Sequence, residues 1–154
     1  MLASKTALKW AMRFYPPFLF QGIWTQKFDD EFWGVQVKII KNIFNKNYNN
    51  SIFGGTTFSA VDPFPVILFH QILKRKGYSV QLWTKHASID YIKPGISSLY
   101  FNISFTDENL QEAILALEEK GKFIKTFQIK ITNKEGILHA IVHNEIYIKK
   151  LALK

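Results

Sequence analysis

Apolar and polar residues alternate along this chain in two rhythms, and the shorter one, with a period of two, predicts strands. A clear case is residues 99–105, in which Leu99, Phe101 and Ile103 alternate with more polar neighbours. Turns separate such segments, among them the acidic run 29–31. Strands are therefore predicted at residues 22–28, 33–40, 78–84, 86–92, 99–105, 123–132 and 137–149.

A longer period of three to four residues predicts helices. The first, at residues 4–14, has Ser4 as its N-cap and ends before a proline pair. Its basic face suits a membrane surface, but we expect it to pack on its own domain. The longest helix spans residues 56–76. A short one follows Thr106, which caps an acidic first turn, and ends before Gly121.

This order of elements predicts an α+β fold in which one long central helix faces a large antiparallel sheet. The N-terminal helix and the short extra helix add to that pair of layers. No internal repeat, low-complexity tract or linker divides the sequence, and 154 residues are enough for one hydrophobic core. We therefore expect a single domain over residues 1–154.

Composition narrows the class of protein. An apolar fraction of 47% excludes a disordered chain, and an aromatic fraction of 16% suggests that some aromatic surface is buried between subunits. The absence of cysteine excludes disulfides and thiolate chemistry, which fits a cytoplasmic protein. No apolar run approaches the roughly 18 residues that a transmembrane helix needs, so we expect no membrane span. The N-terminus also lacks a continuous signal-peptide core.

The formal net charge of +8 would attract nucleic acid, anionic lipid or a phosphorylated molecule such as coenzyme A. The cations are scattered, however, and the longest basic run is Lys74-Arg75-Lys76. A nucleic-acid surface usually carries a denser basic stripe, so we expect no nucleic-acid partner. Nucleic-acid binding would instead predict a steeply salt-dependent affinity.

The strongest candidate for chemistry is an asparagine-rich loop that ends in Gly54-Gly55 and is followed by a helical pattern containing Asp62. Glycine lets a ligand approach the backbone, and N–H groups at a helix start are natural partners for developing negative charge. A nearby carboxylate could activate water or attack a carbonyl, which indicates acyl transfer. Two simpler interpretations stay open. The glycines could form only a tight turn, and Asp62 could be an N-cap before Pro63.

This arrangement resembles the hot-dog fold acyl-CoA thioesterases. In the phenylacetate-type branch, His-Gly-Gly is followed after six residues by a catalytic Asp. Gly54-Gly55 and Asp62 keep that spacing here, while Phe53 replaces the His. Nearly the whole chain resembles an uncharacterised branch, whose members are labelled domains of unknown function or tetrameric acyl-CoA thioesterases. The segments that carry this resemblance are 14–22, 45–48, 53–55, 62–64 and 87–95.

The resemblance implies roles for particular residues. The Gly55 N–H would hold the oxyanion of a thioester, and Asp62 would be the base or nucleophile of hydrolysis. If the helix runs from Gly55, the two residues lie roughly 10 Å apart along its axis, too far to share one thioester within a single chain. The resemblance thus implies a homodimer, or a dimer of dimers, in which Gly55 of one chain faces Asp62 of the other. The substrate-binding candidates are Asn47, Asn49, Phe53, Gly54, Thr56 and Lys93.

A non-catalytic acyl- or lipid-binding protein of the same fold is the alternative, because Phe53 removes the polar group at the family's His position. No cofactor is expected apart from the coenzyme A of the substrate. No metal is expected either, since the pair His139/His143 has helical spacing in a predicted strand. The apolar side chains that could line an acyl tunnel, or equally belong to an ordinary core, are Phe53, Phe58, Phe64 and Trp83.

Overall fold

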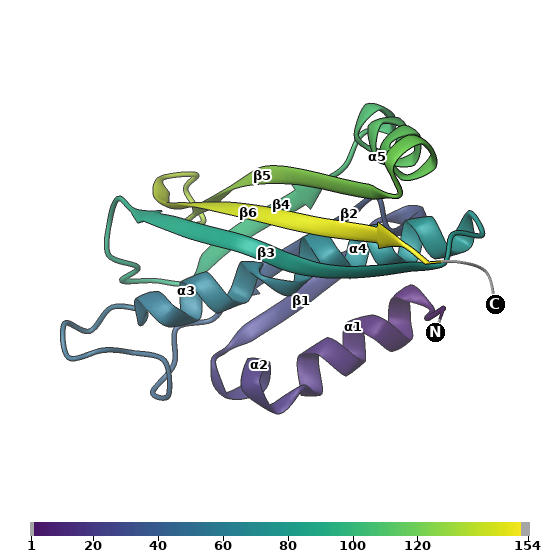
Figure 1. Cartoon of the computed structure of the whole chain (residues 1–154). Helices are drawn as coiled ribbons and strands as arrows, with labels where there is room; N and C mark the ends of the chain where they lie inside the picture. The colour runs from purple at the N-terminus through teal and green to yellow at the C-terminus, as the bar shows by residue number, and fades with distance from the viewer. Residues whose placement is uncertain (1, 152–154) are drawn as a thin grey trace.

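The structure is a computed structural model that describes residues 2–151. A six-stranded antiparallel sheet, in the order β1-β2-β4-β5-β6-β3, curves around the helices α3 and α4 (Figure 1). Helices α1 and α2 lie outside β1, and α5 lies at one end of β5, so the predicted α+β arrangement is confirmed (Figure 1). The elements are α1 (Lys5–Phe14), α2 (Pro16–Phe20), β1 (Ile23–Phe28), a 3-10 turn η1 (Asp30–Phe32), β2 (Gly34–Ile39), α3 (Gly54–Val61), α4 (Pro63–Arg75), β3 (Val80–Tyr91), β4 (Leu99–Ser104), α5 (Asp107–Lys120), β5 (Lys122–Thr132) and β6 (Leu138–Lys150).

The core lies between α4 and the concave face of the sheet and is rich in phenylalanine. Phe64 and Phe69 on α4 are 0% and 1% exposed. The ring of Phe64 lies 5.9 Å from that of Phe101, and the ring of Phe69 lies 4.4 Å from that of Phe105, measured between centroids. Burying each ring stabilises the fold by about 1.5–3 kcal/mol, which fixes this face of α4 against the sheet.

The central helix begins at Gly54, earlier than the predicted 56–76, and is interrupted at Asp62. The interruption follows from Pro63 and Pro65, because neither can donate a hydrogen bond to the carbonyl one turn earlier. Asp62 nevertheless keeps helical dihedral angles, with φ −44° and ψ −52°. The structure thus has an interruption at the point where the sequence left open a helix start before Pro63, and α3 and α4 follow one another as a single rod in Figure 1.

The N-terminal segment contains two helices rather than one. Ser4 caps α1 as predicted, since its hydroxyl accepts a hydrogen bond of 3.1 Å from the Ala7 N–H. The first helix ends before the proline pair, as predicted, and a second helix that was not predicted, α2, starts at Pro16 after the single extended residue Tyr15. Proline is tolerated in the first turn of a helix, where its missing N–H costs nothing. No helix in residues 2–151 is long and apolar enough to cross a bilayer.

Strand β3 is one long edge strand, whereas the sequence predicts two strands at 78–84 and 86–92. Its register against β6 shifts between Thr84 and His86, so a bulge lies at the skipped residue, Lys85. A bulge shifts the alternation of inward and outward side chains by one residue. The sequence pattern on its two sides therefore looks like that of two separate strands. The ammonium of Lys85 lies 3.0 Å from a carboxylate oxygen of Glu145 on β6.

Helix α5 spans 14 residues and is capped at both ends. The Thr106 hydroxyl accepts a hydrogen bond from the Asn109 N–H (3.3 Å), and the Asn109 side-chain oxygen accepts one from the Thr106 N–H (3.2 Å). Gly121 ends the helix in the left-handed region, at φ 67°. Both predicted ends of this helix are thus confirmed.

Candidate functional site

The main candidate site is a pocket of about 470 Å³ at the start of α3. The loop before α3, the end of β3 with the turn that follows it, and the start of β6 form its walls. Ile52, Gly95 and Leu99 give it an apolar side. Of the predicted site residues, the pocket is lined by Asn47, Phe53, Gly54, Gly55 and Lys93.

The glycine pair lines this pocket and carries two backbone N–H groups at a helix start. Gly54 and Gly55 are the first two residues of α3, and neither N–H has an acceptor among the described residues. Both positions are tightly enclosed. A Cβ on Gly55 would lie 2.4 Å from the ring of Phe53, and one on Gly54 would lie 2.9 Å from the ring of Tyr91. Larger residues would displace these rings, so close packing, not an unusual φ, explains the glycines.

The asparagine-rich loop is held by the side chain of Asn47. Its Oδ1 accepts hydrogen bonds from the backbone N–H groups of Asn49 (3.0 Å) and Ser51 (3.1 Å), and from the Ser51 hydroxyl (3.1 Å). The Ile52 N–H then donates to the carbonyl of Gly95 across 2.8 Å. Asn47 thus shapes the pocket wall, while Asn49 is exposed and does not line the pocket.

Tyr91 and His139 also line the pocket, although sequence reasoning did not select them. The Tyr91 hydroxyl donates to the Gly54 carbonyl at 2.7 Å, and burial raises the pKa of Tyr91. His139 is only 6% exposed. Its Nδ1 lies 3.1 Å from the carbonyl oxygen of Pro94 and 3.3 Å from that of Lys93. Because a carbonyl oxygen can only accept, both contacts require Nδ1 to donate its N–H.

No local sequence signal could have placed these two side chains beside Gly54. Tyr91 lies on β3 and His139 on β6, both far from α3 in the sequence. The folding of the sheet brings these two strands to the start of α3. The pairing of Tyr91 with Ala140 in the β3–β6 ladder brings the Tyr91 side chain next to the segment that carries His139.

Asp62 lies at the junction of α3 and α4, outside the pocket, and its side chain is exposed. Its carboxylate neither caps α4 nor bonds to any other described residue. The backbone carbonyl of Asp62 is held instead, by the Thr84 hydroxyl at 3.3 Å and by the side-chain amide of Asn144 at 3.4 Å. Both donors belong to the sheet, so the sheet fixes the backbone from which the free carboxylate projects.

The other predicted residues divide between the core and the surface. Thr56 is buried outside the pocket, and its N–H donates to the Phe53 carbonyl at 3.0 Å. Lys93 is exposed at the pocket rim and forms no ion pair with the described residues. Phe64 belongs to the core, whereas Trp83 stacks on Tyr147 with ring centroids 4.4 Å apart, away from the pocket. No cluster of three or more potential metal ligands occurs within residues 2–151.

Comparison with known proteins identifies the fold. A Pseudomonas aeruginosa protein described as a probable thioesterase superposes with a TM-score of 0.77 at 13% identity, over 97% of this chain and 99% of that one. A thioesterase from Haemophilus influenzae gives 0.70 at 12% identity, over 99% and 98% of the two chains. The E. coli PaaI protein from the phenylacetic acid degradation operon gives 0.58 at 16% identity, over 97% of each.

These similarities confirm the hot-dog fold that the sequence resemblance implies. No curated protein sequence matches the chain. A family model does match it, over residues 4–148 and so almost from end to end. The chain therefore belongs to the family described as the domain of unknown function DUF4442.

Proposed function

We propose that this protein hydrolyses thioesters of the acyl-CoA type. The observation that carries the proposal is the pocket at the start of α3, into which two adjacent backbone N–H groups without acceptors are built. Donors of this kind stabilise the oxyanion that forms when a thioester carbonyl is attacked, and one well-placed donor contributes about 3 kcal/mol in the transition state. The thioesterase descriptions of structural neighbours support the same chemistry.

The catalytic carboxylate in this proposal is Asp62 of the partner subunit. Within one chain, Asp62 does not line the pocket that contains Gly55, and seven helical residues separate the two by roughly 10 Å along the axis. An antiparallel pair of central helices would bring Gly55 of one chain opposite Asp62 of the other. The outer edge of β3, the last strand of the sheet, is free to pair with a second copy and form such a dimer.

The reaction follows from these positions. The Asp62 carboxylate takes a proton from water while the water oxygen bonds to the thioester carbon, and the Gly55 N–H holds the resulting oxyanion. The C–S bond then breaks, coenzyme A leaves as the thiolate and is protonated, and the acyl group leaves as the acid. Alternatively, the carboxylate attacks directly and water hydrolyses the resulting anhydride. In this proposal Lys93, which lines the pocket, contacts the phosphates of coenzyme A.

A non-catalytic acyl-binding role is the second candidate, and the position of Phe53 favours it. Its ring packs against Gly55, where the phenylacetate-type pattern has a polar His. An apolar ring at this point adds surface for an acyl chain and offers no hydrogen bond to the reacting carbonyl.

Thiol release from short-, medium- and long-chain acyl-CoAs tests the proposal. We expect turnover by the wild type and a loss of at least about 100-fold with Asp62→Asn, while Asp90→Asn, which changes an exposed carboxylate on β3, has little effect. Tight acyl-CoA binding without thiol release from any substrate would support the acyl-binding role instead.

A further inference from the structure

Helices α1 and α2 and the loop after β2 carry exposed apolar side chains that the fold itself does not bury. Phe14 and Phe20 are 62% and 57% exposed, and Phe44 is 69% exposed. The inner face of α1 is already occupied, because Leu8 and Met12 pack against the core. We define the docking patch as Trp10, Phe14, Leu19, Phe20, Ile43 and Phe44, all at least two-fifths exposed.

Contacts between aromatic rings join neighbouring members of the patch in two pairs. Trp10 and Phe14 stack along α1 with ring centroids 5.7 Å apart. Phe20, at the end of α2, meets Phe44 edge-to-face at 5.8 Å, which joins the helices to the loop. The Asn42 side chain also donates to the Phe20 carbonyl at 3.4 Å. These segments lie along the same lower side of the molecule in Figure 1.

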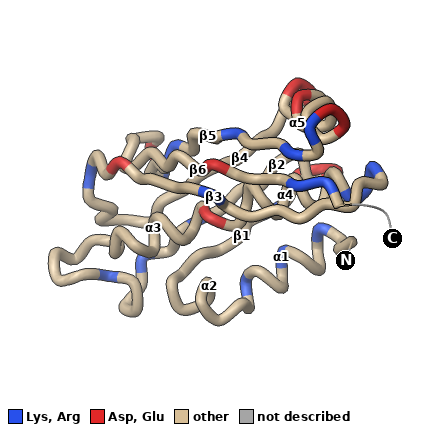
Figure 2. Tube along the Cα trace, viewed as in Figure 1, with Lys and Arg blue, Asp and Glu red and all other residues tan. Residues whose placement is uncertain are grey.

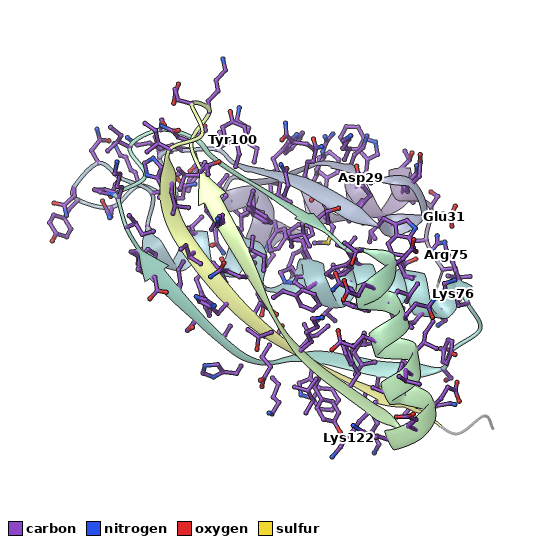
Figure 3. The ribbon with its side chains drawn as sticks, turned by 90° about the horizontal axis from the view of Figure 1, so that it is seen from above. Asp29, Glu31, Arg75, Lys76, Tyr100 and Lys122 are labelled. Atoms are coloured by element: carbon purple, nitrogen blue, oxygen red, sulfur yellow. The ribbon has the colours of Figure 1, made fainter. Side chains whose placement is uncertain are left out.

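All charged side chains within the segments that carry the patch are positive. Residues 1–28 and 32–61 contain no Asp or Glu, and this side of the molecule shows blue without red over α1, α2 and the loop (Figure 2). The only acids before Asp62 are at 29–31. Figure 3 shows Asp29 and Glu31 beside Arg75, at the end of the molecule opposite the loop. The cations in these two segments are Lys5, Lys9, Arg13, Lys27, Lys38, Lys41 and Lys46.

Several of these cations are free to meet an external anion. Lys9, Lys41 and Lys46 form no ion pair with any described residue. Lys9 lies 5.7 Å from the centre of the Trp10 ring, and the Arg13 guanidinium lies 4.6 Å from it. Lys5 and Lys27, by contrast, pair with the carboxylates of Asp30 and Asp29. Lys9, Lys41 and Lys46 are therefore cations near the patch that no described carboxylate neutralises.

We propose that the docking patch binds the surface of an anionic lipid bilayer. Aromatic and aliphatic side chains enter the boundary between headgroups and acyl chains, while Lys and Arg attract anionic headgroups. A second copy of the chain fits less well. In a two-fold interface the patch would face itself, which would oppose the same positive charges without any acidic partner. Nucleic acid would match the positive charge but would leave the exposed apolar side chains of the patch without an apolar partner.

Docking in this way would place the pocket next to the bilayer. The loop that carries Ile43 and Phe44 continues directly into Asn47 and Phe53, which line the pocket. An acyl chain could then pass between the lipid phase and the pocket without crossing much water. The membrane inference does not rest on catalysis, since it requires only the patch and its charges.

Co-sedimentation with vesicles tests the proposal. The full chain should sediment with vesicles of phosphatidylcholine and phosphatidylglycerol, and only weakly with phosphatidylcholine alone. The double variants Phe14→Ser/Phe44→Ser and Lys9→Glu/Lys46→Glu should each weaken binding at least about tenfold. Matched controls, Leu115→Ser on α5 and Lys134→Glu in the β5–β6 turn, change an exposed apolar residue and a cation outside the patch and should leave binding unchanged.

Several results would overturn the inference. The wild type could fail to sediment with either kind of vesicle, or the patch variants could bind as well as the controls. Dissociation of an oligomer by Phe14→Ser/Phe44→Ser, without vesicle binding by the wild type, would identify a second copy as the occupant. Salt-sensitive binding of the wild type to nucleic acid, again without vesicle binding, would identify that partner instead. Circular dichroism of each variant establishes that it is folded.

Discussion

The hydroxyl of Tyr91, at the end of β3, donates a 2.7 Å hydrogen bond to the carbonyl of Gly54, the first residue of α3. The ring of the same tyrosine fills the space in which a Cβ on Gly54 would lie. The end of the edge strand and the start of the central helix are therefore joined directly. Because Gly54 and Gly55 carry the free N–H groups, this contact holds the donors of the proposed oxyanion site.

Replacing Tyr91 tests this contact. Tyr91→Phe keeps the ring over Gly54 and removes only the hydrogen bond, so we expect the free energy of unfolding to fall by about 0.5–1.5 kcal/mol. Denaturant unfolding measures the change. Tyr48→Phe is the matched control, since Tyr48 is 97% exposed and its hydroxyl bonds to no described residue. An equal effect of both substitutions would contradict the role given to Tyr91.

His139 is expected to hold the turn that follows β3. Its Nδ1 bonds to the carbonyls of Lys93 and Pro94 from a buried position. His139→Ala would leave the Lys93 carbonyl without a donor among the described residues, whereas the Pro94 carbonyl keeps the hydrogen bond of 3.1 Å from the Ile96 N–H. We expect a loss of about 1–3 kcal/mol in unfolding free energy. His143→Ala, on the same strand, removes only a 3.5 Å contact with the exposed Asp90 and should cost less than about 1 kcal/mol. Thermal or denaturant unfolding of the two variants compares them directly.

Asn144 is expected to position Asp62. It is completely buried, its amide donates to the Asp62 carbonyl, and its Oδ1 has no partner in the described chain. Asn144→Leu should therefore be tolerated by the fold, because it removes an unsatisfied oxygen together with one long hydrogen bond. If Asp62 is the catalytic carboxylate, kcat should fall by about tenfold or more with KM nearly unchanged. Steady-state kinetics beside an unfolding curve would separate positioning from stability, and an unchanged kcat would rule positioning out.

The lowered pKa of His70 predicts that part of the free energy of unfolding is lost at acidic pH. Burial, followed by the charge of Lys74, lowers the pKa of His70 from its usual 6.5. The unfolded chain therefore binds a proton at His70 more readily than the folded chain does. The stabilising contribution of neutral His70 is complete above pH 6.5, and it is lost as the pH falls toward the lower pKa of the folded state. His70→Gln should therefore flatten the decline in unfolding free energy between about pH 7 and 5. Equal pH profiles for the two proteins would contradict this.

The sequence predicted the layers of this fold because its apolar periodicity is regular. The alternation of residues in β2, β4 and β5 marks them clearly, and the caps at Ser4, Thr106 and Gly121 set helix ends through local hydrogen bonds. Where the pattern failed, one residue changed the local geometry. The bulge at Lys85 reset the alternation within β3, and Pro63 interrupted a helix whose direction Asp62 preserves.

The residues of the candidate site could be predicted from the sequence only in part. The loop residue Asn47 and the glycine pair are close in sequence, so their spacing alone could indicate a site. Tyr91 and His139 come from distant strands and meet Gly54 only through the sheet register. Asp62 raised two alternatives, and of these the structure removes side-chain capping, because the carboxylate makes no cap hydrogen bond. Its role in catalysis stays a prediction.

The measurement that tests the central claim most directly is a mixing experiment between two inactive chains. One chain carries Asp62→Asn. The other chain carries Gly55→Pro, which removes the N–H donor at a position in the first helical turn, where proline is tolerated. It also carries Phe53→Ala, which makes room for the proline ring. Neither homodimer should release thiol from acyl-CoA. Mixed dimers contain one intact site, because the Asp62→Asn chain supplies a normal Gly55 and its partner a normal Asp62.

We therefore expect co-refolded chains to recover about a quarter of wild-type thiol release, since half of the dimers are mixed and each has one working site of two. Tagged purification and mass measurement verify that mixed dimers form. Mixed dimers without recovered activity, or full activity in either homodimer, would contradict a site built from Gly55 of one chain and Asp62 of the other.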